Sequence, residues 1–570
     1  MRGTIPAELG FLTTLTFVHC SENSLTGSIP SSVGRLTNLE QFFVGGNRLT
    51  GTLPDAIFGI NSLTDLRFDR NQIGGSLPLS MGELSSLRGT HNQLTGTIPA
   101  SAGQSLFLQS FEVGHNNLQG TLPDFSSSRI QSWMVNNNNL TGTIPMSLTM
   151  SQLLTNLVVS HNGLSGQLPP FVGQGGRLRE LRIDHNANIN GSLVDMVSTL
   201  PPTLRVLSTT NSGISGSLPS TIGTFTALTS LSLGDGRLSG DVPTEIGLLP
   251  RLEFLYLNGN NLVGTVPTEI GQLGALQVMD LADNQIGGPI PSTIGNCVRL
   301  SSLHTSRSLI SGRFENLVDA LPPSLEILDM NGGMLSGVVP STITRLSNLR
   351  MLSLMGNVIG ESLPTEIGAL TGLENLVLRM NQLSHCLPSE LGLLTALTNA
   401  RLSLNRFNGT LPQDLAGLTK LAALDIAENQ LSGSPTVLSQ IVSLGEEWWF
   451  LLLLLLFPTA VLKGQLDHCC FSDSLFFSPL SWFVVAKQKE MLWMFGNRFE
   501  DIGGVCNGNR SFTLLAANDC NIIKGTLACA CCTHCCHEGG SSCPANGGRA
   551  LSMSERLSEA KSLYQSGNCL

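Results

Sequence analysis

Leucine and other aliphatic residues recur at a fixed spacing over the first 440 residues of this 570-residue chain. The segments LEFLYLNGNNLVGTVPTEIGQLGA (252–275) and LQVMDLADNQIGGPIPSTIGNCVR (276–299) align without a gap and define the unit L-x-x-L-x-L-x-x-N-x-L-x-G-x-[ILV]-P-x-x-[IL]-G-x-L-x-x. We find eighteen copies, with the Asn position at residues 23, 47, 71, 92, 116, 138, 162, 186, 212, 236, 260, 284, 308, 333, 357, 381, 405 and 429. Thirteen of the seventeen intervals are 24 residues long, so the pattern predicts a repeat architecture.

Each part of the unit predicts a local structure. The x-L-x-L-x stretch alternates with period two, which indicates a short strand with Leu inward and variable residues outward. Stacked copies pair in parallel and form one continuous sheet on the concave side. The inward Asn can bond backbone groups of neighbouring coils, which a dry interior requires. Asn occupies this position in fourteen copies, and Ser212, Gly236, Ser308 and Gly333 replace it in the others.

The G-x-[ILV]-P part of the unit narrows the class of repeat. Gly permits a tight turn, the aliphatic residue points inward, and Pro prevents a long convex helix. This motif resembles the plant-type leucine-rich repeat of receptor-like proteins and receptor-like kinases, over residues 1 to about 440. The resemblance implies an α/β solenoid, namely a right-handed superhelix of about 18 repeats with a concave parallel β-sheet and short convex strands or 3₁₀ turns. The first residues, MRGTIPAELG, read as the middle of a repeat and not as a signal peptide.

Charge and motifs limit the chemistry that the repeats can carry. A net charge of −10 with no cluster of Lys and Arg argues against a nucleic-acid surface. The glycine-rich loop, H-R-D loop and D-F-G site of a protein kinase are missing, and we expect no catalytic residue, cofactor or metal ion. Asp184 and His185 could be read as a catalytic pair, but no nucleophile is positioned beside them by the sequence. The repeats therefore predict a binding surface and not an enzyme.

Candidate ligand-binding residues lie at the outward positions of the predicted concave sheet. Arg and Tyr are frequent anchors at protein interfaces, although polar residues also belong on any solvated strand face. The richest cluster of charge spans 179–185. The candidates are Arg67, Asp69, Arg70, Arg179, Glu180, Arg182, Asp184, His185, Tyr256, Asn258, Asp280, His304, Arg379 and Arg401.

Four sequons would accept glycans if the chain enters the secretory pathway. They begin at Asn139, Asn190, Asn408 and Asn509, and the first three are expected in the turn after the strand, an accessible position.

The repeat pattern of domain 1–440 breaks down in the segment 441–500. The apolar run 448–462 has fifteen residues, which is short of the roughly 20 that span a bilayer, and Pro458 interrupts it. Two interpretations stay open for this segment: a membrane-associated stretch, or a non-native insertion.

The remaining segment, 501–570, is a Cys-rich module and tail. Nine cysteines lie between Cys506 and Cys569, a density that requires either disulfides or metal. Adjacent pairs favour disulfides, whereas the C-x-x-C spacings at 529–535 would suit zinc. The C-x-C-C-T-x-C-C stretch resembles the C-terminal element of leucine-rich-repeat receptor-like proteins of diatoms, whose membrane anchor precedes the repeats. The predicted disulfide cysteines are Cys506, Cys520, Cys529, Cys531, Cys532, Cys535, Cys536 and Cys543.

Two functions remain open at this point. The first is a non-catalytic receptor-like recognition protein, membrane-associated with its repeats outside the cell. It would bind a peptide or protein ligand on the concave face and signal through a partner such as a co-receptor kinase. The alternative is an intracellular or wall-associated interaction scaffold, either cytoplasmic or secreted. Export and glycosylation would favour the first function, and reduced thiols with bare sequons the second.

Overall fold

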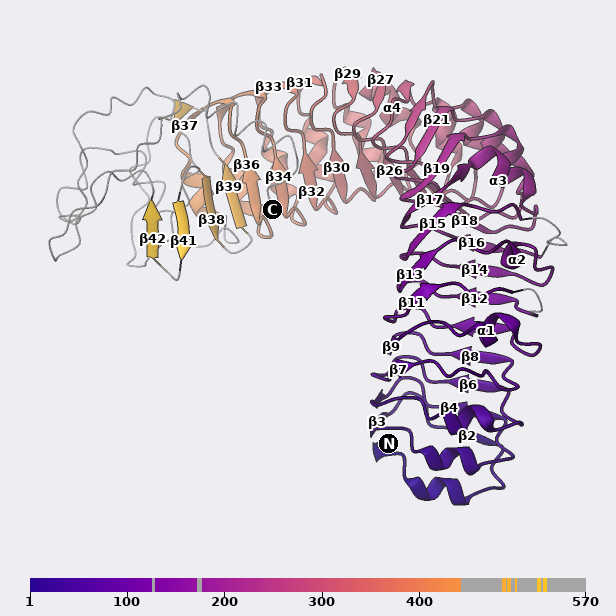
Figure 1. The fold of residues 1–570 in the computed structure, drawn as a ribbon. Helices are drawn as coiled ribbons and strands as arrows, with labels where there is room; N and C mark the ends of the chain where they lie inside the picture. The colour runs from indigo at the N-terminus through magenta and orange to yellow at the C-terminus, as the bar shows by residue number, and fades with distance from the viewer. Residues whose placement is uncertain are drawn as a thin grey trace, which may run out of the picture.

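The computed structural model describes residues 1–125, 129–171 and 177–441, together with the backbone of five strands at 484–487, 490–493, 498–499, 520–523 and 526–529. Residues 1–441 coil into one curved solenoid, with short strands along its inner side and helical turns outside (Figure 1). The predicted solenoid of stacked coils is confirmed.

The inner face of the solenoid is one sheet of parallel strands. Each strand pairs with the next one in chain order, so that Leu255, for example, lies between Leu231 and Met279. Beyond the repeats, β39 (Glu490–Trp493) pairs in parallel with the last inner strand of the eighteenth copy, and β38 (Val484–Lys487) pairs antiparallel with β39. The eighteen inner strands are β2 (Phe17–His19), β4 (Gln41–Phe43), β6 (Asp65–Arg67), β8 (Ser86–Arg88), β10 (Ser110–Glu112), β12 (Ser132–Met134), β14 (Asn156–Val158), β16 (Glu180–Arg182), β18 (Val206–Ser208), β20 (Ser230–Ser232), β22 (Phe254–Tyr256), β24 (Val278–Asp280), β26 (Ser302–His304), β28 (Ile327–Asp329), β30 (Met351–Ser353), β32 (Asn375–Val377), β34 (Asn399–Arg401) and β36 (Ala423–Asp425).

A second set of short strands follows the ladder position of each coil. These strands also pair in parallel, in several separate sheets. Past the repeats, β40 (Arg498–Phe499) pairs with β37, and β41 (Cys520–Ile523) forms a hairpin with β42 (Thr526–Cys529) in which Cys520 lies opposite Cys529. The outer strands are β1 (Arg2–Thr4), β3 (Ser24–Gly27), β5 (Arg48–Leu49), β7 (Gly74–Ser76), β9 (Gln93–Thr95), β11 (Gln119–Thr121), β13 (Asn139–Gly142), β15 (Gly163–Gln167), β17 (Asn186–Ser192), β19 (Ser212–Ser217), β21 (Arg237–Asp241), β23 (Asn261–Val263), β25 (Gly287–Gly288), β27 (Leu309–Arg313), β29 (Met334–Ser336), β31 (Gly360–Ser362), β33 (Gln382–Cys386), β35 (Arg406–Thr410) and β37 (Gln430–Gly433).

The convex side carries helices whose length depends on the repeat's proline. In the part of the chain that the structure describes, a proline directly precedes every 3₁₀ helix and also α1 and α2. In two coils Val194 and Glu315 stand where the unit has proline, and there seven-residue helices form instead. This contrast agrees with the prediction that proline prevents a longer convex helix.

The bounds of the helices are as follows. The α-helices are α1 (Ala100–Gln104), α2 (Met146–Thr149), α3 (Leu193–Thr199) and α4 (Phe314–Ala320). The 3₁₀ helices are η1 (Ala7–Phe11), η2 (Ser31–Arg35), η3 (Asp55–Gly59), η4 (Ser220–Thr224), η5 (Thr244–Leu248), η6 (Thr268–Gln272), η7 (Ser292–Asn296), η8 (Ser341–Arg345), η9 (Thr365–Ala369), η10 (Ser389–Leu393), η11 (Gln413–Gly417) and η12 (Thr436–Gln440).

The aliphatic positions of the unit form one apolar core along the length of the solenoid. Leu231 and Leu352, at the centres of their strands, are 0% exposed. The largest fully buried side chain is Trp133, whose ring stacks on Phe111 at a centroid distance of 4.4 Å and meets the ring of Phe125 edge-on at 4.6 Å. Because one coil is too thin to enclose a core, each coil depends on its neighbours for burial.

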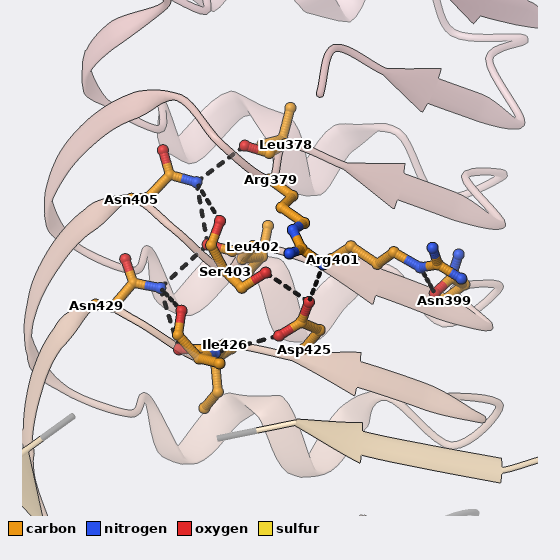
Figure 2. A network of polar contacts seen from close by, with 11 residues as sticks. Leu378, Arg379, Asn399, Arg401, Leu402, Ser403, Asn405, Asp425, Ile426 and Asn429 are labelled. Carbon is orange, nitrogen blue, oxygen red and sulfur yellow. Dashed lines mark hydrogen bonds and ion pairs between the residues drawn. The ribbon is translucent and has the colours of Figure 1, made fainter. Parts of the chain in front are cut away.

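The inward asparagines form a ladder that satisfies the backbone between coils. Figure 2 shows two rungs, in which Asn405 donates to the carbonyls of Leu378 and Leu402, and Asn429 to those of Leu402 and Ile426. Where Ser replaces Asn, one hydroxyl bond is donated instead: Ser212 to Thr209 O at 2.6 Å, or Ser308 to Leu281 O at 3.0 Å.

Candidate functional site

The concave face displays the residues that the sequence nominated for ligand binding. All fourteen lie on an inner strand or in the segment just before or after one, and every one of them is half-buried or exposed. They do not gather at one place, because they are spread from β6 to β34 along the sheet. Nine of them lie in four local clusters, each of which also contains residues that were not predicted from the sequence. Of the other five, Arg182 and Glu180 form an ion pair with each other at 2.6 Å.

The first cluster is a hollow of about 370 Å³ near the N-terminus, lined by residues that include Phe43, Arg67 and Glu112. The Arg67 guanidinium lies 2.7 Å from the Asp65 carboxylate and 4.3 Å from the centroid of the Phe43 ring. The hydrogen bonds that Arg67 donates to the Asp65 carboxylate raise the pKa of Arg67. The cluster thus presents a cation held between a carboxylate and an aromatic ring, a suitable contact for a polar or aromatic ligand group.

The second cluster is a row of imidazoles at the position immediately before the ladder Asn. His91 stacks on His115, and His161 stacks on His185, each pair with ring centroids 4.0 Å apart. Burial, and then the neighbouring His91, lower the pKa of His115. Of these four histidines, only His185 is among the residues predicted from the sequence, although the dipeptide His-Asn recurs at 91, 115, 161 and 185 and indicates the row.

Within this row, Asp184 accepts a hydrogen bond from the Ser160 hydroxyl at 2.8 Å and lies 3.9 Å from His161 Nε2. The hydroxyl therefore donates to a carboxylate and not to an imidazole. A serine nucleophile needs the reverse arrangement, with its proton directed at a histidine base. The geometry at 184–185 suits binding better than a hydrolytic relay.

The third cluster combines acidic and aromatic groups at the middle of the solenoid. Burial raises the pKa of Tyr256, and burial also raises the pKa of Asp280. The carboxylate of Asp329, 3.8 Å from His304 Nδ1, raises the pKa of that imidazole. Burial alone would raise the pKa of Asp329, but interactions with His304 and Ser306 outweigh it and lower that pKa. The cluster therefore holds an imidazole–carboxylate pair beside a second carboxyl group, Asp280, whose pKa is raised.

The fourth cluster lies near the C-terminal end of the repeats (Figure 2). Arg379 is 18% exposed and lies 3.9 Å from the carboxylate of Asp425, which also accepts a hydrogen bond from Ser403 at 2.5 Å. Burial raises the pKa of Asp425. Arg401 is exposed, and its Nε lies 3.4 Å from Asn399 Oδ1. Arg379 is thus mainly part of an internal network, whereas Arg401 is accessible to a ligand.

The remaining sequence predictions concern sequons, cysteines and the apolar segment. Asn139, Asn190 and Asn408 are exposed, but they lie in the outer strands β13, β17 and β35 and not in the turn that we expected. Cys20, Cys297 and Cys386 are free thiols. The sequon at Asn509, the segment 448–462 and the side chains of the Cys-rich module lie outside the described residues. Among the described helices, none is long and apolar enough to cross a bilayer.

Comparisons with known proteins agree with the geometry. The family model for the Leucine Rich Repeat matches residues 251–273 and 275–297. The structure of the plant peptide hormone receptor RGFR1 in complex with RGF2 is 31% identical, with 78% of this chain and 79% of that chain covered and a TM-score of 0.65. This chain belongs to the leucine-rich repeat family.

Two further structures are similar to this leucine-rich repeat protein. The ectodomain of the Arabidopsis thaliana membrane receptor kinase GASSHO1/SCHENGEN3, in complex with CASPARIAN STRIP INTEGRITY FACTOR 2, is 31% identical with a TM-score of 0.72. The match covers 78% of this chain but only 56% of that one, so the protein spans about half of that ectodomain. The Arabidopsis receptor kinase HAESA, in complex with the peptide hormone IDA and the co-receptor SERK1, is 29% identical with a TM-score of 0.66, and the match covers 78% of this chain and 79% of that one. No curated protein matches by sequence.

Proposed function

We propose that this leucine-rich repeat protein is a non-catalytic, plant-type receptor-like recognition protein that binds a peptide or protein ligand on its concave face. The observation that carries the proposal is its likeness, at 31% identity, to a plant peptide hormone receptor solved with its peptide. In this proposal, signalling passes through a partner such as a co-receptor kinase. HAESA, solved with both a peptide hormone and a co-receptor, supports that arrangement.

The physical form of the concave face supports an extended ligand. A long, shallow sheet can contact many residues of an extended peptide, with each coil meeting about one side chain. Arg67, Arg182 and Tyr256 offer flat, partly desolvated groups at separate points along the face. Such groups act as anchors in protein interfaces.

A binding experiment can test the location of the ligand site. Peptides that bind the full chain would be selected from a displayed random library. Their dissociation constants would then be measured for the unsubstituted protein and for the variants Arg182→Glu and Tyr256→Ala. The matched control is Arg237→Glu, which changes an exposed arginine on the outer strand β21. We expect concave substitutions to weaken binding at least tenfold and the control to leave it unchanged. Binding that survives the concave changes and fails in the control would place the site elsewhere and contradict the proposal.

We also propose that the repeats are extracellular, that the protein is membrane-associated, and that the sequons and module cysteines are modified. Non-reducing peptide mapping by mass spectrometry of the protein from its own cells reads these features together. Glycans at Asn139, Asn190 and Asn408 with disulfides in 506–543 are expected. Bare sequons and free thiols would instead favour the scaffold function inside the cell. The same map reports whether peptides from 448–493 exist, which tests the inserted segment.

A further inference from the structure

Three potential metal ligands meet on the concave face at the boundary between the seventh and eighth coils. One ligand atom each from His161, Asp184 and His185 lies within 4.8 Å of the other two. His161 Nε2 is 3.9 Å from Asp184 Oδ2, and the two side chains are 48% and 14% exposed. The His161 side chain is therefore open to solvent, whereas the Asp184 carboxylate is largely buried beside it.

Neighbouring residues fix the orientation of these groups. Ser160 donates its hydroxyl to Asp184 Oδ1 at 2.8 Å, which leaves Oδ2 directed towards His161. On the other side, Asn211 Nδ2 lies 3.3 Å from His185 Nδ1, so the second ring nitrogen of His185 is available. Partners of this kind, one bond removed from the ligand atoms, orient imidazoles and carboxylates in metal sites.

The backbone also sets the spacing of the two imidazoles. His161 and His185 occupy equivalent positions in adjacent coils, with φ of 53° and 54°. Each is followed by a ladder asparagine, Asn162 or Asn186, which bonds to backbone carbonyls including Val159 O at 3.0 Å in both cases. The rings are thereby stacked one coil apart, at 4.0 Å, before any ion binds.

We propose that His161, Asp184 and His185 bind a divalent transition-metal ion of the zinc class. Two imidazole nitrogens and one carboxylate oxygen form a ligand set typical of zinc sites that keep a position open. Ligand atoms around a tetrahedral zinc ion are about 3.3 Å apart, because each metal–ligand bond is about 2.0–2.1 Å. Imidazole nitrogens bind a metal in the plane of the ring, so the two stacked rings must rotate before they converge on one ion, and ligand-atom separations within 4.8 Å keep all three groups within reach of it.

The nearby arginine does not oppose a cation at this site. Arg182, on the same strand, directs its Nε at Glu180 Oε1 at 2.6 Å, so its charge is compensated. The sequence pattern alone did not predict this site, since His161 and Asp184 are separated by 23 positions and only the stacking of coils joins them.

The other imidazole pair of the row supplies an internal control. His91 and His115 stack with the same 4.0 Å centroid distance and an interplanar angle of 13°, against 15° for His161 and His185. However, Gly114 stands at the position that corresponds to Asp184. If the carboxylate completes the site, only the second pair should bind metal tightly.

Isothermal titration of the full chain with zinc chloride tests the proposal. The accessible cysteines are alkylated first, so that thiols of the Cys-rich module do not compete for the ion. We expect Asp184→Asn and His185→Gln each to lower the affinity of one zinc site at least tenfold. The double variant His91→Gln/His115→Gln should bind as the unsubstituted protein does. Circular dichroism checks that the solenoid is folded in every variant, as expected for surface positions.

Unchanged zinc affinity in Asp184→Asn and His185→Gln would overturn the proposal, as would an equal loss in the His91/His115 double variant. Copper(II) gives a second readout, because electron paramagnetic resonance counts the nitrogens bound to the ion. We expect two imidazole nitrogens in the unsubstituted protein and one in His185→Gln. A spectrum that is identical in the two proteins would also refute the site.

The open coordination position faces the concave side, where a carboxylate or imidazole of a bound peptide would complete the zinc sphere. This last step rests on the proposed function. The zinc titration contains no peptide, so loss of zinc binding and loss of peptide binding are separate outcomes. If the chain binds zinc but no peptide, the metal site is supported and the receptor function is contradicted. If it binds a peptide but no zinc, the receptor function is supported and the metal site is contradicted.

Discussion

Replacing Asn260 with alanine removes a side chain that makes four hydrogen bonds to backbone groups of its own coil and the preceding one. Its Oδ1 accepts from Leu238 N–H at 3.0 Å, and its Nδ2 donates to the carbonyls of Leu233, Leu257 and Asn258 at 2.9, 3.0 and 3.1 Å. Asn260 is 6% exposed, so water does not replace these bonds easily.

The expected loss of stability follows from which partners keep another bond. Leu257 O still accepts from Asn284 Nδ2 at 2.9 Å, and Asn258 O still accepts from Asp235 N–H at 2.7 Å. Leu238 N–H and Leu233 O lose the partner that Asn260 provides. Each buried polar group left without a partner costs about 1–3 kcal/mol, so the free energy of unfolding should fall by roughly 2–6 kcal/mol.

Ser308→Ala is the matched control, at the same ladder position two coils after Asn260. Its hydroxyl donates a single bond, to Leu281 O at 3.0 Å, and that carbonyl also accepts from Asn284 Nδ2 at 3.2 Å. Leu281 O therefore keeps one hydrogen bond when the Ser308 hydroxyl is removed. The expected cost is therefore about 1 kcal/mol, the net value of one ordinary hydrogen bond.

Urea denaturation of the full chain, followed by circular dichroism, measures the two losses under the same conditions. Hydrogen exchange by mass spectrometry adds a local readout, since repeat proteins open coil by coil. Peptides that contain Leu238 should exchange faster in Asn260→Ala, with little change in distant coils. If Asn260→Ala costs no more than Ser308→Ala, the ladder does not stabilise the coils as we argue.

Three other predictions follow from burial and charge. In histidine-labelled protein, nuclear magnetic resonance should show a pKa of His304 above the ordinary histidine value and a pKa of His115 below it. The same pKa for both would contradict the pairing of His304 with the Asp329 carboxylate. Because the folded pKa of His304 is raised, its contribution to stability is present below the unfolded pKa and is lost as the pH rises through the folded value. Burial raises the pKa of Cys297 to about 11, so a thiol reagent at pH 8 should modify exposed Cys386 at least tenfold faster; equal rates would show that the coil opens. The buried indole N–H of Trp133 has no hydrogen-bond partner, so Trp133→Phe should cost less than half of the roughly 3–5 kcal/mol expected for Trp133→Ala in denaturation experiments.

Much of the fold could be predicted because the same pattern of residues recurs in every coil. The alternation around Leu255 fixes a strand, and the recurrence of that strand every 24 residues fixes its parallel neighbours. The proline of the unit likewise predicts short convex helices, and the two coils without it confirm the reason. A single occurrence of either signal would be ambiguous, whereas repetition selects one register.

The contacts on the concave face could be predicted only in part. Outward positions are identified by alternation, so Arg182 and Tyr256 were nominated correctly as surface residues. Which neighbours they meet depends on side-chain orientation across coils, and no spacing within one coil encodes it. Arg379 illustrates the difference, because its outward position suggested a free cation, while the adjacent Asp425 draws it into a largely buried network.

The asparagine ladder gives the solenoid a direction. Asn260 bonds to Leu233 and Leu238 of the coil before it, and Asn284 in turn bonds to Leu257 and Leu262 of the coil of Asn260. The ladder asparagine of each coil therefore satisfies backbone groups of the coil before it, and those backbone groups depend on the following coil. During synthesis, a coil that has left the ribosome still lacks polar partners until about 24 more residues emerge, so the growing end is always the incomplete one. Deleting coils from the C-terminal end would leave backbone groups such as Leu238 N–H without their asparagine, whereas deleting them from the N-terminal end would leave asparagine side chains such as Asn260 without their backbone partners.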